Sequence, residues 1–172
     1  TASDLEQALA LASDREVSLG WTQVQDAHGS WGEVAMMRKL IGEGRIKVRI
    51  YKPISGPSAD AERLIAQGPG GPELADRLTV RGIKVVMDGA LGSRGAAMLA
   101  PYSDDPHTSG LITTDTVALK GMLERALRAG IQVETHAIGD RANQITLGMY
   151  AAALKAVPPA QRTVKDPRWR IE

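Results

Sequence analysis

Two side chains at predicted strand ends have the chemistry of metal ligands. His136 ends the alternating segment 131–136, directly before a glycine-containing turn and a helical pattern. Lys84 lies inside the alternating segment 82–88, where a strand buried on both faces would carry apolar residues. An imidazole at the carboxyl end of a parallel strand is a typical metal ligand in an α/β enzyme. The alternative is a histidine that only forms hydrogen bonds inside the protein.

Lys84 is open to two interpretations. A buried lysine is costly unless it is paired or chemically changed. As a neutral amine it could capture CO2 as a carbamate and bridge two divalent metal ions. It could equally form an ion pair with Asp88 or with a residue on another strand. The residues alone leave both possibilities open.

The strand that contains Lys84 leads into a glycine-rich loop. Asp88 ends the strand, and Gly89–Gly95 can bring backbone close to a ligand. Arg94 in this loop could hold an anionic or carbonyl group of a substrate, or could form a salt bridge within the loop. The glycine spacing matches neither a dinucleotide-binding loop nor a Walker loop. A non-catalytic α/β module that holds a small anion on this loop is therefore the rival to an enzyme.

Predicted helices and strands alternate along the chain, which is typical of βα units and a parallel sheet. The predicted strands cover residues 21–26, 46–51, 82–88 and 131–136, with another from 169 onward. The main predicted helices cover residues 32–41, 61–67, 114–130 and 140–156. Thr114 is the expected N-cap of the third of these helices. The long segment between residues 89 and 113 is a predicted functional loop.

Two α/β architectures fit this alternation, an open doubly wound sheet and part of a TIM-type (β/α) barrel. Alternation places Lys84 and Asp88 on one face of their strand, and Gln132, Glu134 and His136 on one face of theirs. Helices cover both faces of an open sheet, whereas the interior of a barrel is often polar near its catalytic mouth. The polar faces favour the partial barrel.

The composition excludes several kinds of protein. A formal net charge of +1 with scattered basic residues gives no nucleic-acid-binding surface. The absence of cysteine rules out disulfides and thiolate ligands and is consistent with a reducing compartment, so we expect a cytoplasmic protein. No apolar run approaches the roughly 20 residues of a membrane span. His28 and His107 lie in predicted loops and are expected to be solvated.

Three segments together resemble the metal-dependent amidohydrolase superfamily, and most of all its formamide-deformylase-like branch, amidohydrolase family three. They are Gly82–Ala96, which contains Asp-Gly-Ala-Leu-Gly-Ser-Arg, then Pro101–Pro106, and His136–Ala142, which reads His-Ala-Ile-Gly-Asp-Arg-Ala. The two longer motifs are specific in combination. The resemblance extends over nearly the whole chain.

The resemblance implies a distorted β/α barrel that hydrolyses a non-peptide C–N bond of an amide, formamide or cyclic amide with metal-activated water. By this resemblance Lys84 matches the bridging ligand of the fourth strand, as a possible carbamate. His136 matches the ligand of the fifth strand. The implied cofactor is a divalent metal, with zinc expected, and Asp88 and Arg94 would shape the substrate-binding loop.

Other parts of the family's metal site are missing from this sequence. It contains no His-x-His motif, and neither the sixth-strand histidine nor the eighth-strand aspartate of the family is present. We therefore expect residues 1–172 to be a single fragment covering about strands two to six of eight, with the N-terminal and C-terminal parts of the parent absent. Such a fragment has no identified catalytic residue and is expected to be inactive in isolation. Its partners would be a small amide-type substrate and, through open barrel edges, other copies of itself.

Overall fold

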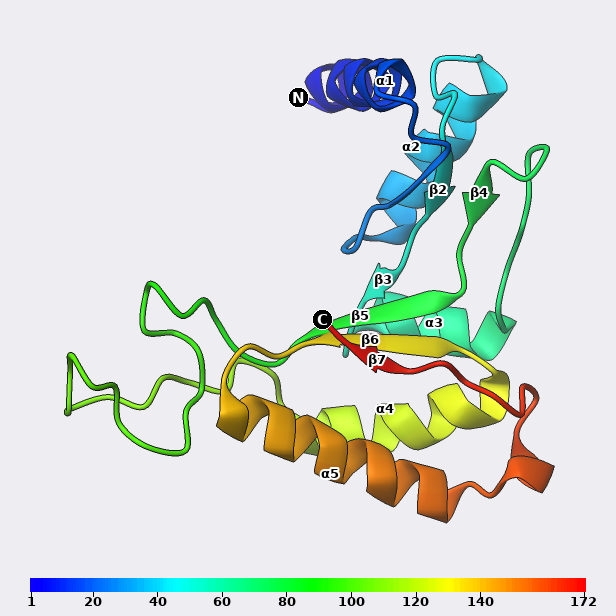
Figure 1. Cartoon of the computed structure of the whole chain (residues 1–172). Coiled ribbons are helices and arrows are strands. Elements are labelled where there is room, and N and C mark those ends of the chain that lie inside the picture. The colour runs from blue at the N-terminus through cyan, green and yellow to red at the C-terminus, as the bar shows by residue number, and fades with distance from the viewer.

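The computed structural model describes residues 1–172 and consists of helices that alternate with short strands (Figure 1). The helices are α1 (Ala2–Ser18), α2 (Trp31–Gly42), α3 (Ala59–Gln67), α4 (Thr116–Ala129) and α5 (Asp140–Ala156), followed by the 3-10 helix η1 (Pro159–Gln161). The strands are β1 (Gln23–Gln25), β2 (Arg49–Tyr51), β3 (Ile54–Ser55), β4 (Leu78–Thr79), β5 (Gly82–Val86), β6 (Gln132–His136) and β7 (Arg170–Ile171). None of the helices combines the length and apolar character needed to cross a membrane.

All pairs of neighbouring strands are parallel, and their order in space follows the chain. One sheet has the order β1-β2-β4 and the other β3-β5-β6-β7. The chain passes directly from one sheet to the other twice, because only two residues separate β2 from β3 and β4 from β5. The five predicted strands are present as β1, β2, β5, β6 and β7, whereas the two short strands β3 and β4 lie in segments where no strand is predicted. The order lacks the reversal that defines a doubly wound sheet.

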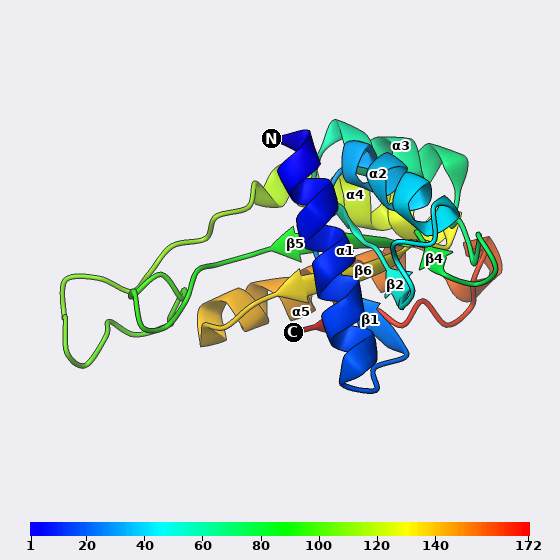
Figure 2. The same ribbon diagram turned by 90° about the horizontal axis from the view of Figure 1, so that it is seen from above.

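Helices cover one face of the larger sheet. Figure 1 shows α3, α4 and α5 on the same side of β5, β6 and β7, and Figure 2 shows the same molecule from above. Ile83, Val85 and Val133 point toward these helices and are fully buried. They belong to one apolar cluster of 28 buried residues that also includes Met122 and Leu123 of α4. The apolar face of each strand is thus the face toward the helices, as the alternation predicts.

The helix boundaries follow the sequence pattern, with one incorrect cap. The structure confirms the predicted helices near residues 32–41, 61–67, 114–130 and 140–156 to within about two residues. The N-cap of α4 is Asp115 and not Thr114, because the Asp115 carboxylate accepts hydrogen bonds from the amides of Val117 and Ala118. The Thr114 hydroxyl instead donates to the carbonyl of Val86, at the end of β5.

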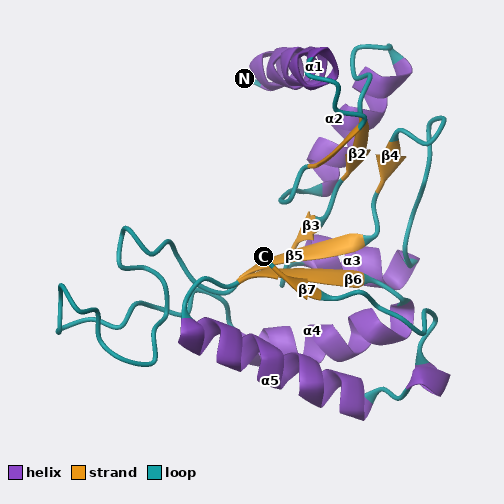
Figure 3. Cartoon of the chain, in the orientation of Figure 1, coloured by secondary structure: helices purple, strands orange, loops and turns teal.

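A long loop separates β5 from α4, and no helix or regular strand lies between residues 87 and 115. Figure 3 shows it as the extended teal segment that projects beyond the ends of the strands. It leaves the sheet at the carboxyl end of β5, next to the N-terminus of α5, in both ribbon views. Parallel sheets place their ligand-binding sites at this end.

Candidate active site

The polar face of the sheet gathers the charged residues that the sequence places inside strands. The register of β5 with β6 pairs Lys84 with Glu134 and Val86 with His136. Lys84 and His136 are therefore diagonal neighbours on the same face, two residues apart along adjacent strands. A strand spacing of about 4.8 Å and a rise of about 3.3 Å per residue put their Cα atoms about 8 Å apart. The predicted metal ligands share one face at adjacent strands.

Lys84 is buried and ion-paired in this structure. Its ammonium group donates to Oε1 of Glu172, directly after β7. Of the two possible ion-pair partners considered from the sequence, the structure shows the residue on another strand and not Asp88. A buried lysine with a carboxylate partner escapes the cost of an isolated charge. The structure therefore shows Lys84 in an ion pair, with Glu172 as its partner.

His136 ends β6 and is partly exposed on the polar face. Its Nε2 lies 4.0 Å from Oδ1 of Asp88, too far for a hydrogen bond. Val86 of β5 is paired with His136 in the sheet, and its apolar side chain is exposed. A neutral imidazole with an accessible ring nitrogen can serve as a metal ligand.

Glu134 lies between the two predicted ligands but forms a hydrogen bond with neither of them. It accepts a hydrogen bond of 2.5 Å from Nε2 of Gln25 on β1 and another from Nη2 of Arg170 on β7. Burial raises its pKa, and the nearby guanidinium of Arg170 partly opposes this. Its other oxygen, Oε1, is buried and has no hydrogen-bond partner. Gln25, Glu134 and Arg170 thus connect the first strand to the last two across the polar face.

Asp88 is fully buried and fixes the turns on both sides of the site. Its Oδ2 accepts hydrogen bonds of 2.8 Å from the amides of Ala97 and Gly139, and its Oδ1 accepts one of 2.9 Å from the amide of Ile138. The carboxylate therefore ties the end of β5 to the long loop and to the turn after His136. Asp88 positions the loop, and the substrate contact expected for it stays a prediction.

Gly139 of the segment His136–Ala142 lies in close backbone contact with Ala97 of the long loop. A Cβ at Gly139 would lie 1.9 Å from the carbonyl oxygen of Ala97, so only glycine fits here. The same carbonyl accepts hydrogen bonds from the amides of Arg141 and Ala142 in the first turn of α5. The segments 88–97 and 136–142 are thus two halves of one backbone junction. Sequence reasoning found both motifs but not their contact.

Arg94 lies at the outer part of the loop and pairs within it. Its Nη2 lies 3.0 Å from Oδ2 of Asp104, and this hydrogen bond raises the pKa of the guanidinium. Its backbone has a φ of 54°, a left-handed conformation that few non-glycine residues adopt. The structure thus shows the loop salt bridge considered from the sequence, and the substrate contact of Arg94 remains a prediction.

Three amides of the glycine-rich loop donate hydrogen bonds to carbonyls of the same loop. The amide of Gly89 donates to the carbonyl of Gly95, that of Gly95 to Ala90, and that of Arg94 to Leu91. An anion-binding nest requires backbone amides that point together at a ligand. These three amides are directed inside the loop and are therefore not available to a small anion.

The structure contains no group of three or more His, Cys, Asp or Glu side chains placed to hold a metal ion. Lys84 and His136 could supply at most two ligands, and one of them only after chemical change. A zinc site in proteins has three or four protein ligands. The residues of this chain fit part of a metal centre and not the whole of one.

Comparison with known proteins identifies the family. A family model described as "Amidohydrolase family" matches residues 1–172. The chain belongs to the amidohydrolase family. The resemblance carried by the loop after β5 and the His136 motif is thereby confirmed.

Individual relatives match over different parts of the chain. A putative amidohydrolase, YtcJ of Bacillus subtilis, is 39% identical over 77 residues, which are 45% of this chain and 14% of that protein. The exoenzymes regulatory protein AepA of Pectobacterium carotovorum is 32% identical over 155 residues, which are 86% of this chain and 32% of that protein.

A solved structure supports the same assignment. The crystal structure of an uncharacterized metal-dependent hydrolase from Pyrococcus horikoshii matches with a TM-score of 0.75 and 28% identity, over 88% of this chain and 31% of that one. The amidohydrolase chain described here thus spans about a third or less of the length of these relatives.

Removing the Asp88 carboxylate should loosen the junction. Asp88→Ala leaves the buried amides of Ala97 and Gly139 and the partly buried amide of Ile138 without an acceptor, and an unsatisfied buried group costs about 1–3 kcal/mol. We expect the free energy of unfolding in urea to fall by at least about 2 kcal/mol. The amides of Ala97, Ile138 and Gly139 should also exchange hydrogen faster. Asp104→Ala, on the exposed part of the same loop, is the control, with a change within about 0.5 kcal/mol. Equal effects of the two changes would contradict the junction.

Glu134 should make stability depend on pH. Because its pKa in the folded chain lies above the ordinary value of 4.5, the folded state holds the proton more tightly than the unfolded state. This contribution is fully present below pH 4.5 and is lost as the pH rises through the raised pKa. Relative to Glu134→Gln, the wild type should therefore lose stability as the pH rises from 4.5 upward, which urea unfolding can measure. A constant difference between the two proteins across this range would contradict the shift.

Proposed function

We propose that these 172 residues form an arc of a TIM-type (β/α) barrel, about strands two to six of eight. Three observations support this. The strands are parallel and follow one another in chain order. Helices α3, α4 and α5 lie on one face of the larger sheet. The opposite face carries Lys84, Glu134 and Arg170, as the interior of a barrel near its mouth would.

We propose further that the parent protein hydrolyses a non-peptide C–N bond, in an amide, formamide or cyclic amide, with metal-activated water. The observation that carries this is the placement of Lys84 and His136 on one face of adjacent strands, in a chain matched along its whole length by the amidohydrolase family. The solved relative from Pyrococcus horikoshii is described as a metal-dependent hydrolase, which supports the metal.

His136 and Lys84 would hold a divalent metal, with zinc as the best candidate for an imidazole ligand. A bound metal of this kind lowers the pKa of a coordinated water enough to give hydroxide near neutral pH. For Lys84 to contribute, its ammonium group must leave Glu172 and lose a proton to solvent. The neutral amine would then attack CO2, which forms an N–C bond and breaks one C–O π bond, and loss of a second proton from nitrogen would give the carbamate. Asp88 holds the backbone of residues 138 and 139 in place beside His136.

The remaining ligands are proposed to come from parts of the parent outside these residues. Relatives are about three times as long or longer. With at most two ligands, a metal ion is held weakly, so the 172-residue chain is proposed to be inactive by itself. A cytoplasmic location stays a prediction from the cysteine-free sequence.

Zinc should bind at His136 at a lower concentration than at the other two histidines. The chain has only His28, His107 and His136, so their ring signals can be followed separately by NMR during a zinc titration. We expect the His136 signals to respond at the lowest zinc concentration, and chelation with EDTA to reverse the change. His136→Ala should remove this first event, and His107→Ala should leave it. Simultaneous response of all three histidines would contradict a site at His136.

The isolated chain should not turn over substrate. We expect purified chain supplied with zinc and bicarbonate to hydrolyse N-formyl amides and cyclic amides no faster than buffer with zinc alone. Product can be measured by chromatography. Turnover that disappears in His136→Ala would show that two ligands are enough and would refute the inactivity.

We also propose that the chain self-associates through its open sheet edges. β1 and β7 each have only one neighbouring strand. The carbonyl of Thr22 and the amide of Asp26 form hydrogen bonds with β2. Because backbone groups alternate in direction along a strand, the amide of Gln23 points to the free edge of β1. Free edges recruit other strands. Light scattering after size exclusion should show mass rising with concentration, and Gln23→Pro should reduce this because proline removes the outward donor. A monomer at every concentration would contradict the proposal.

A further inference from the structure

A small cavity at the amino end of the larger sheet contains an arginine without a partner. We call it the Arg81 cavity, and its volume is about 210 Å³. Arg81 directly precedes β5, and Gln132 begins β6. The long loop and the carboxyl ends of these strands lie at the opposite end of the sheet (Figures 1 and 2). The lining residues are Arg81, Gly130, Gln132, Val164, Asp166, Pro167 and Arg168.

The guanidinium of Arg81 lacks the acceptors that other arginines of the chain have. Its Nε is buried and has no hydrogen-bond partner. Arg125 and Arg170, in contrast, each form a salt bridge with a glutamate. An arginine cannot lose its charge by giving up a proton, and a buried N–H without an acceptor is costly. A ligand that supplies an acceptor to Arg81 would remove this cost.

Backbone carbonyls beside the cavity do not supply that acceptor. The last turn of α4 ends at the cavity, where Gly130 has a φ of 76°. The carbonyls of residues 126–128 already accept hydrogen bonds from Ile131, Gly130 and Thr163. Arg81 therefore does not cap α4, and its guanidinium remains available.

Two further donors line the Arg81 cavity. Oε1 of Gln132 accepts a hydrogen bond from the hydroxyl of Tyr51, which leaves the amide NH2 of Gln132 free to donate. Arg168 supplies a second guanidinium, and Nε of this residue lies 3.5 Å from Oδ2 of Asp166. Asp166 is the only acidic residue of the lining. Its charge is balanced by Arg168, so the charge of Arg81 is left over.

The walls of the cavity are held in place by close packing. A Cβ at Gly130 would lie 2.9 Å from Cγ2 of Val164 and 3.3 Å from Cβ of Thr163. The segment before β7 is therefore packed against the end of α4. Nε1 of Trp169 donates a hydrogen bond of 3.0 Å to the carbonyl of Ile131 and fixes the same segment to the start of β6. The donors of the cavity are thus preorganised.

We infer that the Arg81 cavity binds a small oxyanion of the phosphate type. A guanidinium presents its N–H groups in a fixed fork that matches the oxygens of such an anion. A tetrahedral oxyanion can accept from Arg81, Arg168 and Gln132 on different oxygens. The inference does not depend on the proposed function. Because the cavity lies at the end of the strands away from His136, we assign the anion a stabilising role and not a part in hydrolysis.

Two features of the cavity oppose an anion and make Arg81 necessary for binding. The carboxylate of Asp166 repels it, and so does the carboxyl end of α4, which carries the negative end of the helix dipole. Without Arg81 the lining would have no net positive charge. Removal of this one guanidinium should therefore have a large effect on binding.

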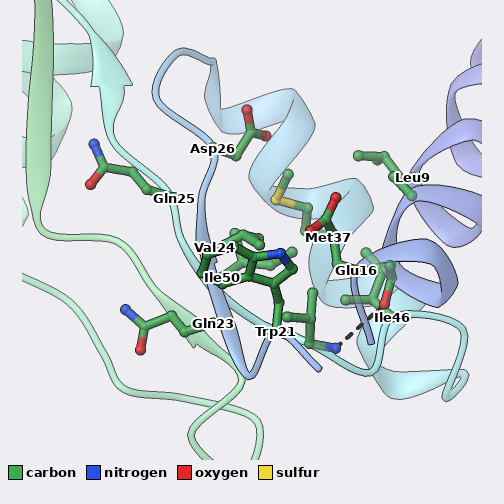
Figure 4. A pocket seen from close by; sticks show the side chains of 13 residues that line it. Leu9, Glu16, Trp21, Gln23, Val24, Gln25, Asp26, Met37, Ile46 and Ile50 are labelled. Carbon is green, nitrogen blue, oxygen red and sulfur yellow. Dashed lines mark hydrogen bonds between the residues drawn. The ribbon is translucent and has the colours of Figure 1, made fainter. Parts of the chain in front are cut away.

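A larger groove serves as an internal control. It lies between α1, α2 and β1, and Figure 4 shows Glu16, Trp21, Asp26 and Met37 among the residues that line it. No lysine or arginine lines this groove. An anion should not bind there, and the indole N–H signal of the exposed Trp21 should not move.

Binding can be tested by NMR on the metal-free chain. Inorganic phosphate is titrated near neutral pH, with chloride adjusted to keep the ionic strength constant. We expect a saturable shift of the Nε–H signal of Arg81, the side-chain amide of Gln132 and the backbone amide of Arg168. The melting temperature should rise with phosphate concentration, because a ligand of the folded state stabilises it. Chloride alone should give neither change.

Variants separate the cavity from general attraction to positive charge. Arg81→Gln should weaken phosphate binding at least about tenfold, the effect of losing charge-assisted hydrogen bonds. Arg15→Gln on α1 removes the same charge from an exposed arginine that forms no salt bridge, and should leave binding unchanged. Arg81→Lys keeps the charge but not the fork. It should bind phosphate with intermediate affinity, and it serves as the test if Arg81→Gln does not fold.

A phosphate group could come from free phosphate or from a phosphate ester. Glycerol 3-phosphate distinguishes the two sources. Tighter binding of the ester than of inorganic phosphate at the same residues identifies the phosphate group of a larger molecule, and weaker binding identifies the free ion. Either order supports an oxyanion site.

Three results would overturn the inference. The first is an equal response to chloride at the same ionic strength. The second is equal weakening of binding in Arg81→Gln and Arg15→Gln. The third is a set of shifts confined to basic residues outside the Arg81 cavity, which would show non-specific attraction of the anion.

Discussion

The buried carboxylate of Asp88 is the contact on which the candidate site depends. It accepts amides from Ala97, Ile138 and Gly139, so one side chain fixes the end of β5, the long loop and the turn after His136. A buried charge is stable only when hydrogen bonds replace its hydration, and three backbone amides do so here. The course of the turn after His136 and of the long loop where it meets that turn both follow from this arrangement.

Charges on the polar face of the sheet form a connected series. Lys84 pairs with Glu172, whose carboxylate also lies 3.8 Å from Arg170, and Arg170 contacts Glu134. Gln25 joins the series from β1. Opposite charges thus alternate across β5, β6 and β7, and the buried members avoid the cost of isolated ions. A change in the state of Lys84 would leave Glu172 and Arg170 to reorganise together.

The sequence predicts the local features well, because strand alternation and helix periodicity depend on near neighbours. Helices, strands, the apolar face with Ile83 and Val85, and the polar face with Lys84 and His136 are found as expected. The partner of Lys84 could not be predicted, since Glu172 lies 88 residues away and only the register of β5, β6 and β7 brings it near. The amide contacts of Asp88 could not be predicted for the same reason, since Ile138 and Gly139 lie in a turn that is distant in the sequence.

The order in which the Asp88 contacts can form has a consequence for folding. Its bond to Ala97 spans 9 residues, but those to Ile138 and Gly139 span 50 and 51. During synthesis the chain from residue 89 to 113 emerges well before the turn that completes its anchor. Until β6 has paired with β5, the Asp88 carboxylate stays hydrated and the loop has the entropy of an open chain. Ordering of the loop is therefore a late event, set by long-range strand pairing.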